Sequence, residues 1–360
     1  MNKEFFRALA LLEEEKGISK EKMLEDIEKA MVAALKKEYE KTNIEVRVHI
    51  NPDKEDVTFY RQKRIVETVV NEDVEISLED AKKKSKRYKL GEIYETEIKA
   101  KDLKRISASQ ARQIIINAVR DASKRATAQR LEKKREHIIT ARVEKIHPQT
   151  KDALICFDDE KYQVILAESE QIPGEELKVD QLIKVFVQEA ERRDGGKSVI
   201  ISRRHTGFLR RLFELEVPEI ASGDVVLASI ARDPGSRSKV SVYSRAEGID
   251  AIGACIGQNK SRIESIVREL AGEKVDIIPY SEDKGEYIKA ALSPASVEYV
   301  VMQAPQSAQV YVASNQFSLA VGKAGQNVRL AAKLTSSKID IIDISKAEAA
   351  EEEESAEDAE

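Results

Sequence analysis

The sequence has no long apolar run, and this absence limits where the protein works. No stretch approaches the twenty or so apolar residues that a membrane-spanning helix needs. The N-terminal segment MNKEFFRALALLEEEKG contains acidic residues where a signal peptide would be purely apolar. We therefore expect a soluble, cytoplasmic protein with no membrane partner.

Residues that commonly bind metals or carry redox chemistry are also scarce. The two cysteines, Cys156 and Cys255, lie far apart in apolar surroundings, which favours reduced, buried thiols over a disulfide framework or a metal knuckle. The four histidines show no spacing typical of metal ligands. They are His49, His137, His147 and His205. There is no Walker-type phosphate motif and no pair of acids in a catalytic setting. We expect no metal, no cofactor and no enzymatic activity.

The acidic net charge of −5 comes from one end of the chain. Residues 347–360, AEAAEEEESAEDAE, hold eight acids and no base. The preceding 346 residues carry 60 basic and 57 acidic side chains, a net charge of +3. The segment with this composition is expected to be a disordered tail, and the folded part of the chain is slightly basic.

The basic residues gather in two places. Residues 101–142 hold twelve Lys and Arg against four acids, and residues 192–211 hold seven against one. A single cluster of this kind is usually a solvated helix face or a charged hairpin. Two clusters together with the glycine-bracketed loop described below favour a polyanionic partner.

The length of 360 residues allows two to four domains. The first 134 residues are typical of an α/β domain. Its expected elements are a helix ending at Gly17, a helix over 19–41, a hairpin over 44–60, a short helix from Ser77 and a long helix from Ser107. Asp80 and Gln110 stand at the capping-box positions of the last two helices. The long helix is expected to connect this domain to the next one.

Residues 135–202 read as short alternating strands separated by turn signals. Five such strands are enough for a β-barrel of the OB type, a fold that often binds single-stranded nucleic acid. The aromatic residues available as stacking platforms are Phe157, Tyr162 and Phe186. Each of them fits a core position equally well.

An internal repeat occupies residues 203–345. ACIGQNKSRIESIVRELAGEKVDII (254–278) aligns with LAVGKAGQNVRLAAKLTSSKIDII (319–342). Gly257 matches Gly322 at an offset of 65, and KVDII matches KIDII at an offset of 64. Each copy predicts a helix, a tight loop, a helix and a strand, preceded by further strands. Chance does not place the same loop twice in the same setting.

The loop of the second copy has the chemistry of a phosphate contact. Glycines at its edges let a sugar–phosphate backbone approach closely, and the next helix presents its N-terminal amides. Lys323 adds a mobile positive charge. The module known for this use is the KH domain with its Gly-x-x-Gly loop. The first copy has Lys260 in place of the second glycine, so it is either a second contact or a purely structural repeat.

A third basic segment is ARDPGSRSKV, residues 231–240. It carries Arg232, Arg237 and Lys239 around a Pro-Gly turn. These three side chains are candidates for a second contact with nucleic acid. Taken alone, the segment is also what an ordinary basic turn would show.

The whole chain resembles the NusA family of bacterial transcription elongation, termination and antitermination factors. The resemblance rests on MNKEF, KAMVAALKKEYE, LFELEVPEI, ARDPGSRSKVSV, IGACIGQNKSRI, GEKVDII and AVGKAGQNVRLAAKLT, in this order. It implies a multidomain α+β protein. Its expected parts are an N-terminal RNA-polymerase-binding domain with the long connecting helix (1–134), an OB-fold S1 barrel (135–202), two tandem type II KH domains (203–278 and 279–345) and the acidic disordered tail (346–360).

The resemblance also implies site residues and partners. The expected RNA contacts of the second loop are Gly322, Lys323, Ala324, Gly325, Gln326, Asn327 and Arg329. Those of the first loop are Gly257, Gln258, Asn259, Lys260 and Arg262. The implied partners are RNA polymerase, nascent single-stranded RNA and other transcription or antitermination factors. The implied function is non-catalytic control of pausing, termination and antitermination.

Two other functions fit parts of the sequence. RNA-degrading or RNA-modifying enzymes also carry barrel and KH modules, but the chain shows no catalytic motif. A ribosome-assembly factor would fit the RNA-binding modules equally well. The resemblance of residues 1–130 argues for transcription over ribosome assembly.

Overall fold

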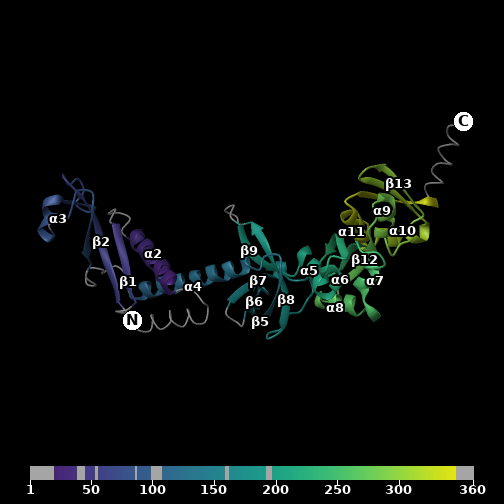
Figure 1. The fold of residues 1–360 in the computed structure, drawn as a ribbon, viewed down its shortest axis with the longest axis horizontal. Coiled ribbons are helices and arrows are strands. Elements are labelled where there is room, and N and C mark those ends of the chain that lie inside the picture. Colours follow the sequence, from purple (N-terminus) through teal and green to yellow (C-terminus); the bar gives the residue numbers. More distant parts are fainter. Residues whose placement is uncertain are drawn as a thin grey trace. The chain divides into compact units, whose positions relative to one another are not determined.

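The computed structural model describes residues 20–38, 45–52, 56–85, 87–98, 108–158, 162–191 and 197–345 (Figure 1). The chain divides into two compact units, Met1–Arg130 and Leu131–Glu360. The expected helix ending at Gly17 and the acidic tail lie outside the described residues.

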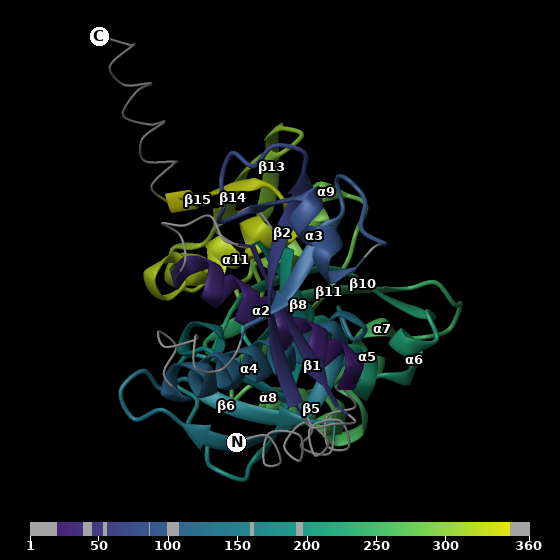
Figure 2. The same cartoon turned by 90° about the vertical axis from the view of Figure 1, so that its left-hand side faces the viewer.

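The first unit contains a four-stranded sheet with helix α2 along strand β1 (Figure 1 and Figure 2). Its elements are α2 (Lys20–Glu38), β1 (Glu45–Asn51), β2 (Asp56–Val66), β3 (Glu75–Ser77), α3 (Leu78–Lys84), β4 (Ile93–Glu97) and α4 (Ala108–Glu132). Every second side chain of β1 is buried, because successive side chains of a strand point to opposite faces. The buried side chains are Val46, Val48 and Ile50 on β1 and Leu24, Ile27 and Met31 on α2.

The predicted hairpin and the capped helix are confirmed. Strand β1 pairs antiparallel with β2, which runs on to Val66 because it also pairs with β3 and β4. At the start of α3 the Ser77 side chain accepts a hydrogen bond from the Asp80 backbone N–H at 3.1 Å. The long helix expected from Ser107 is present as α4.

The second unit begins with the five strands expected over 135–202. They are β5 (Ile138–Ile146), β6 (Ala153–Phe157), β7 (Tyr162–Leu166), β8 (Leu182–Glu191) and β9 (Lys197–Ser202), with the short helix η1 (Glu168–Glu170) after β7. The sheet order is β7-β6-β5-β8-β9, and all neighbours are antiparallel. The two edge strands, β7 and β9, also contact each other. This brings the edges of the sheet together around a buried aliphatic core.

The aromatic residues of this sheet are mostly core residues. Phe157 is buried in the interior of the five-stranded sheet, and Tyr162 stacks on it. Phe186 is buried on the other side of its strand, where its ring stacks on His205 with 5.2 Å between centroids. The choice left open by the sequence is therefore settled for the two phenylalanines, which do not form an exposed platform.

The two repeats follow with the same order of elements, except that the first has an extra short helix before its strands. The first comprises α5 (Thr206–Glu216), α6 (Pro218–Ala221), β10 (Val225–Asp233), β11 (Arg237–Ser244), α7 (Ala251–Ile256), η2 (Gln258–Lys260), α8 (Ser261–Glu269) and β12 (Lys274–Pro279). The second comprises α9 (Lys284–Ala291), β13 (Tyr299–Ala304), β14 (Ser307–Val312), α10 (Ser314–Val321), η3 (Lys323–Gly325), α11 (Gln326–Thr335) and β15 (Lys338–Asp343). In both, the first two strands are antiparallel and the third is parallel to the second. The predicted helix–loop–helix–strand order is confirmed twice.

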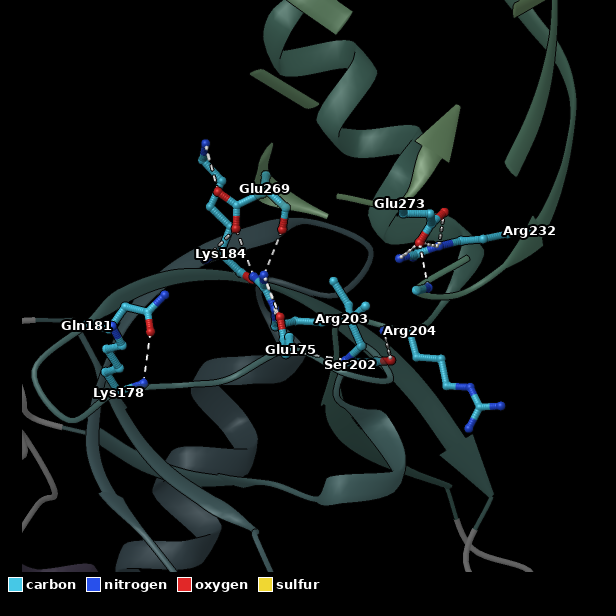
Figure 3. Close-up of polar contacts among 12 residues, drawn as sticks. Glu175, Lys178, Gln181, Lys184, Ser202, Arg203, Arg204, Arg232, Glu269 and Glu273 are labelled. Atoms are coloured by element: carbon cyan, nitrogen blue, oxygen red, sulfur yellow. Dashed lines mark hydrogen bonds and ion pairs between the residues drawn. The ribbon is translucent and has the colours of Figure 1, made fainter. Parts of the chain in front are cut away.

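Buried ion pairs join the five-stranded sheet to the first repeat (Figure 3). The guanidinium of Arg203, at the end of β9, donates to both carboxylate oxygens of Glu175 at 3.1 and 3.0 Å. It also donates to the Glu269 carboxylate at 2.8 Å and to the Glu269 backbone carbonyl at 2.8 Å. Arg203 therefore ties the loop before β8 to the end of helix α8.

The first repeat packs directly on the second. The Tyr287 hydroxyl of α9 donates to Ser241 of β11 at 2.7 Å. The Lys239 ammonium of β11 donates to the Ser293 carbonyl at 2.6 Å. Ala231 and Ile278 of the first repeat belong to the hydrophobic core of the second. The core of the second repeat thus extends onto the sheet of the first, which also has a core of its own.

Candidate nucleic-acid interface

The loop of the second repeat joins α10 to α11 through a backbone that needs glycine. Gly322 has φ 75° and ψ 171°, a conformation in which other residues are strained. A Cβ atom on Gly322 would also stand 2.8 Å from the Asn327 backbone nitrogen. Gly325 is left-handed at φ 71°, but a Cβ there would meet no atom within 4 Å. The loop therefore packs against the start of α11 at Gly322, whereas at Gly325 the space beside its backbone is open.

Asn327 holds this loop from inside. Its side-chain amide donates to the Leu292, Ala320 and Leu319 carbonyls at 2.9, 3.0 and 3.3 Å. The side chain is buried, so the amide fixes the end of α10 against the start of α11. Asn327 supports the loop and does not present its side chain to a ligand.

The first repeat has the same loop backbone although its second glycine is replaced. Gly257 has φ 75° and ψ 169°, within 2° of Gly322. Asn259 and Ala324, in the middle of each loop, have φ 51° and 52°. Lys260 takes the left-handed position of Gly325, with φ 62° and ψ 17° against 71° and 17°. The substitution that distinguishes the first loop in the sequence therefore leaves its shape unchanged.

Arg262 plays the part in the first loop that Asn327 plays in the second. The two residues are 65 positions apart, the offset of the repeat. Arg262 donates to the Ala254 carbonyl at 2.5 Å, and Asn327 donates to the equivalent Leu319 carbonyl. Arg262 also forms an ion pair with Glu219 at 2.8 Å. Its guanidinium is therefore engaged within the repeat.

Comparison with known proteins matches three segments of this chain to NusA domains. Residues 4–125 match the NusA N-terminal domain, residues 203–280 the NusA-like first KH domain and residues 284–349 the NusA-like second KH domain. The chain is 42% identical to the transcription termination/antitermination protein NusA of Halalkalibacterium halodurans, over 95% of this chain and 88% of that protein. This chain belongs to the NusA family.

A further relative agrees with the family assignment. The NusA protein of Bacillus subtilis is 39% identical over 95% of this chain and 91% of its own length. The solution structure of the N-terminal domain of the B. subtilis NusA protein aligns with 34% of this chain and 99% of its own, with 36% identity and a TM-score of 0.30. The NusA-like repeats, here called KH1 and KH2, are the tandem KH domains that the sequence predicts.

Each KH loop has a few exposed side chains that a ligand could reach. They are Lys323 and Ala324 in KH2 and Gln258, Asn259 and Lys260 in KH1. Neither the Lys260 nor the Lys323 side chain has a hydrogen-bond or ion-pair partner among the described residues. Both loops thus present one mobile cation next to the N-terminus of a helix, an arrangement that attracts phosphate.

Gln326 and Arg329 lie against an acid that the sequence did not single out. The Gln326 amide donates to the Asp233 carboxylate at 2.6 Å and to the Ser236 hydroxyl at 2.7 Å. Arg329 stands 3.6 Å from the same carboxylate. Asp233 is 93 positions before Gln326, so no local pattern could have predicted this contact. The turn between β10 and β11 of KH1 therefore meets the KH2 loop.

Two of the three basic candidates in that turn need correction. Arg232 is buried and paired with the buried Glu273 at 3.0 Å. Burial lowers the pKa of its guanidinium, and the charge of Glu273 opposes that shift. The Lys239 side chain is wholly inaccessible and lies 3.4 Å from Asp276. We drop Arg232 and Lys239 as RNA contacts because their charges are used within the protein.

Arg237, the third candidate, is partly exposed. Its guanidinium donates twice to the Asp276 carboxylate, at 2.6 and 2.9 Å. These hydrogen bonds to the Asp276 carboxylate raise the pKa of Arg237. The residue keeps about a quarter of its side chain exposed, so a ligand would have to share it with Asp276.

The basic clusters of the sequence are partly structural as well. Arg203 is buried between two acids, and Arg211 donates to the Glu136 carbonyl at 2.5 Å. In the other cluster, Arg125 pairs with Asp26 at 3.2 Å and Lys134 with Asp158 at 2.6 Å. Residues 101–107 and 192–196 of these clusters lie outside the described residues.

The described residues offer no metal site or membrane span. No group of three or more His, Cys, Asp or Glu in the described part of the chain is placed to hold a metal ion. Within the same residues, no helix is both long enough and apolar enough to cross a bilayer. Cys156 and Cys255 are both buried, as predicted, and they are not joined in a disulfide.

Proposed function

We propose that this chain acts as a non-catalytic regulator that binds RNA polymerase and nascent single-stranded RNA. Through these contacts it would control pausing, termination and antitermination in the cytoplasm. Membership in a family of transcription termination/antitermination proteins supports the process. The KH assignments support RNA as the ligand.

The observation that carries the RNA interface is the repeated loop. Two loops in one chain hold the same strained backbone, each with an exposed lysine beside a helix N-terminus. A purely structural connection would not need the strain in both copies. We assign the phosphate contacts to Gly322–Gly325 with Lys323 and to Gly257–Lys260 with Lys260. Gln326, Arg329 and Arg237 would be secondary contacts that Asp233 and Asp276 restrain.

The proposed domains follow the sequence boundaries. We assign polymerase binding to residues 1–134 and RNA binding to an S1-type barrel over 135–202, KH1 over 203–278 and KH2 over 279–345. The five-stranded order with its edges in contact supports the OB class for the barrel. The mechanism is avidity: weak contacts on one chain raise the effective concentration for each other.

A pausing assay with the full chain tests this function. Gly325→Asp places a carboxylate in open space on the KH2 loop, where it should repel the RNA backbone. We expect RNA affinity to fall about tenfold, or roughly 1.4 kcal/mol, and pausing by RNA polymerase to weaken with it. Gly272→Asp is the matched control. Gly272 also has a positive φ and open space around it, but it follows the C-terminal end of α8, whereas the KH1 loop precedes that helix.

Two further measurements separate the alternatives. If the full chain fails to bind purified RNA polymerase yet binds RNA and ribosomal proteins, the transcription function is wrong and ribosome assembly replaces it. If labelled RNA incubated with the chain and magnesium is cleaved or modified, the non-catalytic assignment is wrong.

A further inference from the structure

The sheet of KH2 has one face away from its helices, and this face is partly apolar. The residues that point to it alternate with residues that pack toward the KH2 core, which are Val300 on β13, Ala308 and Val310 on β14, and Ile339 and Ile341 on β15. We call this set the open face: Tyr299, Val301, Gln309, Tyr311, Asp340 and Ile342. Tyr299 is 50% exposed and Val301 39% exposed. The Tyr299 and Tyr311 rings stack with 4.5 Å between their centroids.

The repeat shows which surface of KH1 is equivalent to the open face. In KH1, Ser241 pairs with Ile278 across β11 and β12; in KH2, Tyr311 pairs with Ile342 across β14 and β15. The same registers place Lys239 opposite Asp276 and Gln309 opposite Asp340. On the first strand of each sheet, Ser229 and Ala231 correspond to Tyr299 and Val301.

In KH1 this surface is covered by helices. Helices α9 and α11 of KH2 contact the strands β10, β11 and β12 of KH1. Ile278 and Ala231 enter the KH2 core, and Ser241 accepts the hydrogen bond of Tyr287 from α9. The established interface between the repeats therefore consists of a sheet face that receives a helical layer.

The open face of KH2 carries larger and more apolar side chains than the equivalent, covered face of KH1. Ser229 and Ala231 are small, whereas Tyr299 and Val301 at the same positions are large and exposed. A solvated face of an antiparallel pair normally carries polar residues. Exposed apolar side chains gathered on one sheet face indicate an interaction surface.

We propose that the open face docks an amphipathic α-helix of another protein, continuing the array by the contact that joins KH1 to KH2. The chain itself supplies no matching occupant from residues 346–360, nor from α9 and α11 of a second copy. Residues 346–360 contain no Leu, Ile, Val, Met or aromatic residue with which to cover the face. A second copy could not offer α9 and α11 in the same way, because these helices already cover KH1.

Site-specific photocross-linking in the full-length chain tests the docking. A photoreactive benzoylphenylalanine replaces Val301 on the open face, and in a control chain it replaces Ile165, a 62%-exposed residue of β7. After irradiation in living cells, the cross-linked peptides are mapped by mass spectrometry. We expect one protein to be cross-linked only from position 301, within a segment predicted to form an amphipathic helix.

The mapped protein is then purified and titrated against the unmodified chain. Tyr299→Ala and Val301→Arg should each weaken its binding at least tenfold, whereas Ile165→Ala should not. RNA affinity should be the same in all these variants, which separates this docking from the RNA interface. Cross-links to RNA, to a second copy or to residues 346–360 would overturn the proposal, as would a yield at 301 no higher than at 165.

Discussion

Gly322 and Gly325 belong to one loop, but the structure needs them for different reasons. Alanine at 322 would be strained at a positive φ and would press its Cβ onto the backbone of α11. Alanine at 325 would meet only the left-handed strain. We expect Gly322→Ala to lower the free energy of unfolding by about 2–4 kcal/mol and Gly325→Ala by about 1 kcal/mol. Urea denaturation of both variants measures this, and equal losses would contradict the geometry.

Asp233 restrains the KH2 loop from the neighbouring repeat. Its carboxylate accepts a hydrogen bond from the Gln326 amide and pairs with the Arg329 guanidinium. It therefore competes with an RNA phosphate for both side chains. Asp233→Asn keeps an acceptor for Gln326 but removes the charge. We expect RNA affinity at low salt to rise about fivefold, on the order of 1 kcal/mol. Asp340→Asn, on the open face, should change nothing; weaker RNA binding by Asp233→Asn would mean that the acid only positions the loop.

Cys255, a buried thiol in the core of KH1, should make the free energy of unfolding depend on pH. Burial raises the pKa of its thiol to about 12, whereas an unfolded thiol ionises near 8.5. Between about pH 8.5 and pH 12 only the unfolded chain loses this proton, so the free energy of unfolding falls as pH rises, by at most about 1.4 kcal/mol per unit. Denaturation midpoints of Cys255→Ala should show a flatter decline over this range than those of the unsubstituted chain. Parallel declines would refute this account.

At the scale of elements, the junction between the barrel strands and α8 depends on one arginine. Removing Arg203 leaves the buried Glu175 carboxylate and the Glu269 carboxylate without their main counter-charge. Breaking a buried pair in this way typically lowers stability by about 3–5 kcal/mol. We expect this loss for Arg203→Met, measured by chemical denaturation. The neighbouring exposed Arg204→Met should stay within about 0.5 kcal/mol, and similar losses for both would show that the network contributes little.

The order of the elements in the repeats could be predicted, whereas the roles of their charged residues could not. The glycine spacing and the KVDII and KIDII segments reveal the repeat. A loop that needs glycine, or a strand that needs alternating apolar residues, shows this requirement in its own sequence. The burial of Arg232 and Lys239 depends on Glu273 and Asp276, which are 41 and 37 positions away. A single sequence does not distinguish a lysine that is buried in an interface from an exposed lysine that can bind phosphate. Helix α5 was likewise hidden, since its apolar residues lie among the arginines of a basic cluster.

For the whole molecule, the two exposed loop lysines should act on one RNA strand. On single strands, each phosphate contact contributes about 0.7 to the slope of log affinity against log salt concentration. Lys323→Gln in the full chain should therefore reduce the slope by about 0.7, and the double variant with Lys260→Gln by about 1.4. Lys289→Gln, an exposed lysine on α9, is the control. If the double variant changes the slope no more than Lys323→Gln alone, the KH1 loop does not touch RNA.

The packed interface between KH1 and KH2 also fixes the spacing of their two loops. Because Tyr287, Ser241, Lys239 and Ser293 hold the repeats together, the distance between the two loops is set by the protein and not by the ligand. A transcript that touches both loops must supply the number of nucleotides that spans this gap. The chain would then select RNA by the spacing of its contact sites, because the spacing of the two loops is fixed.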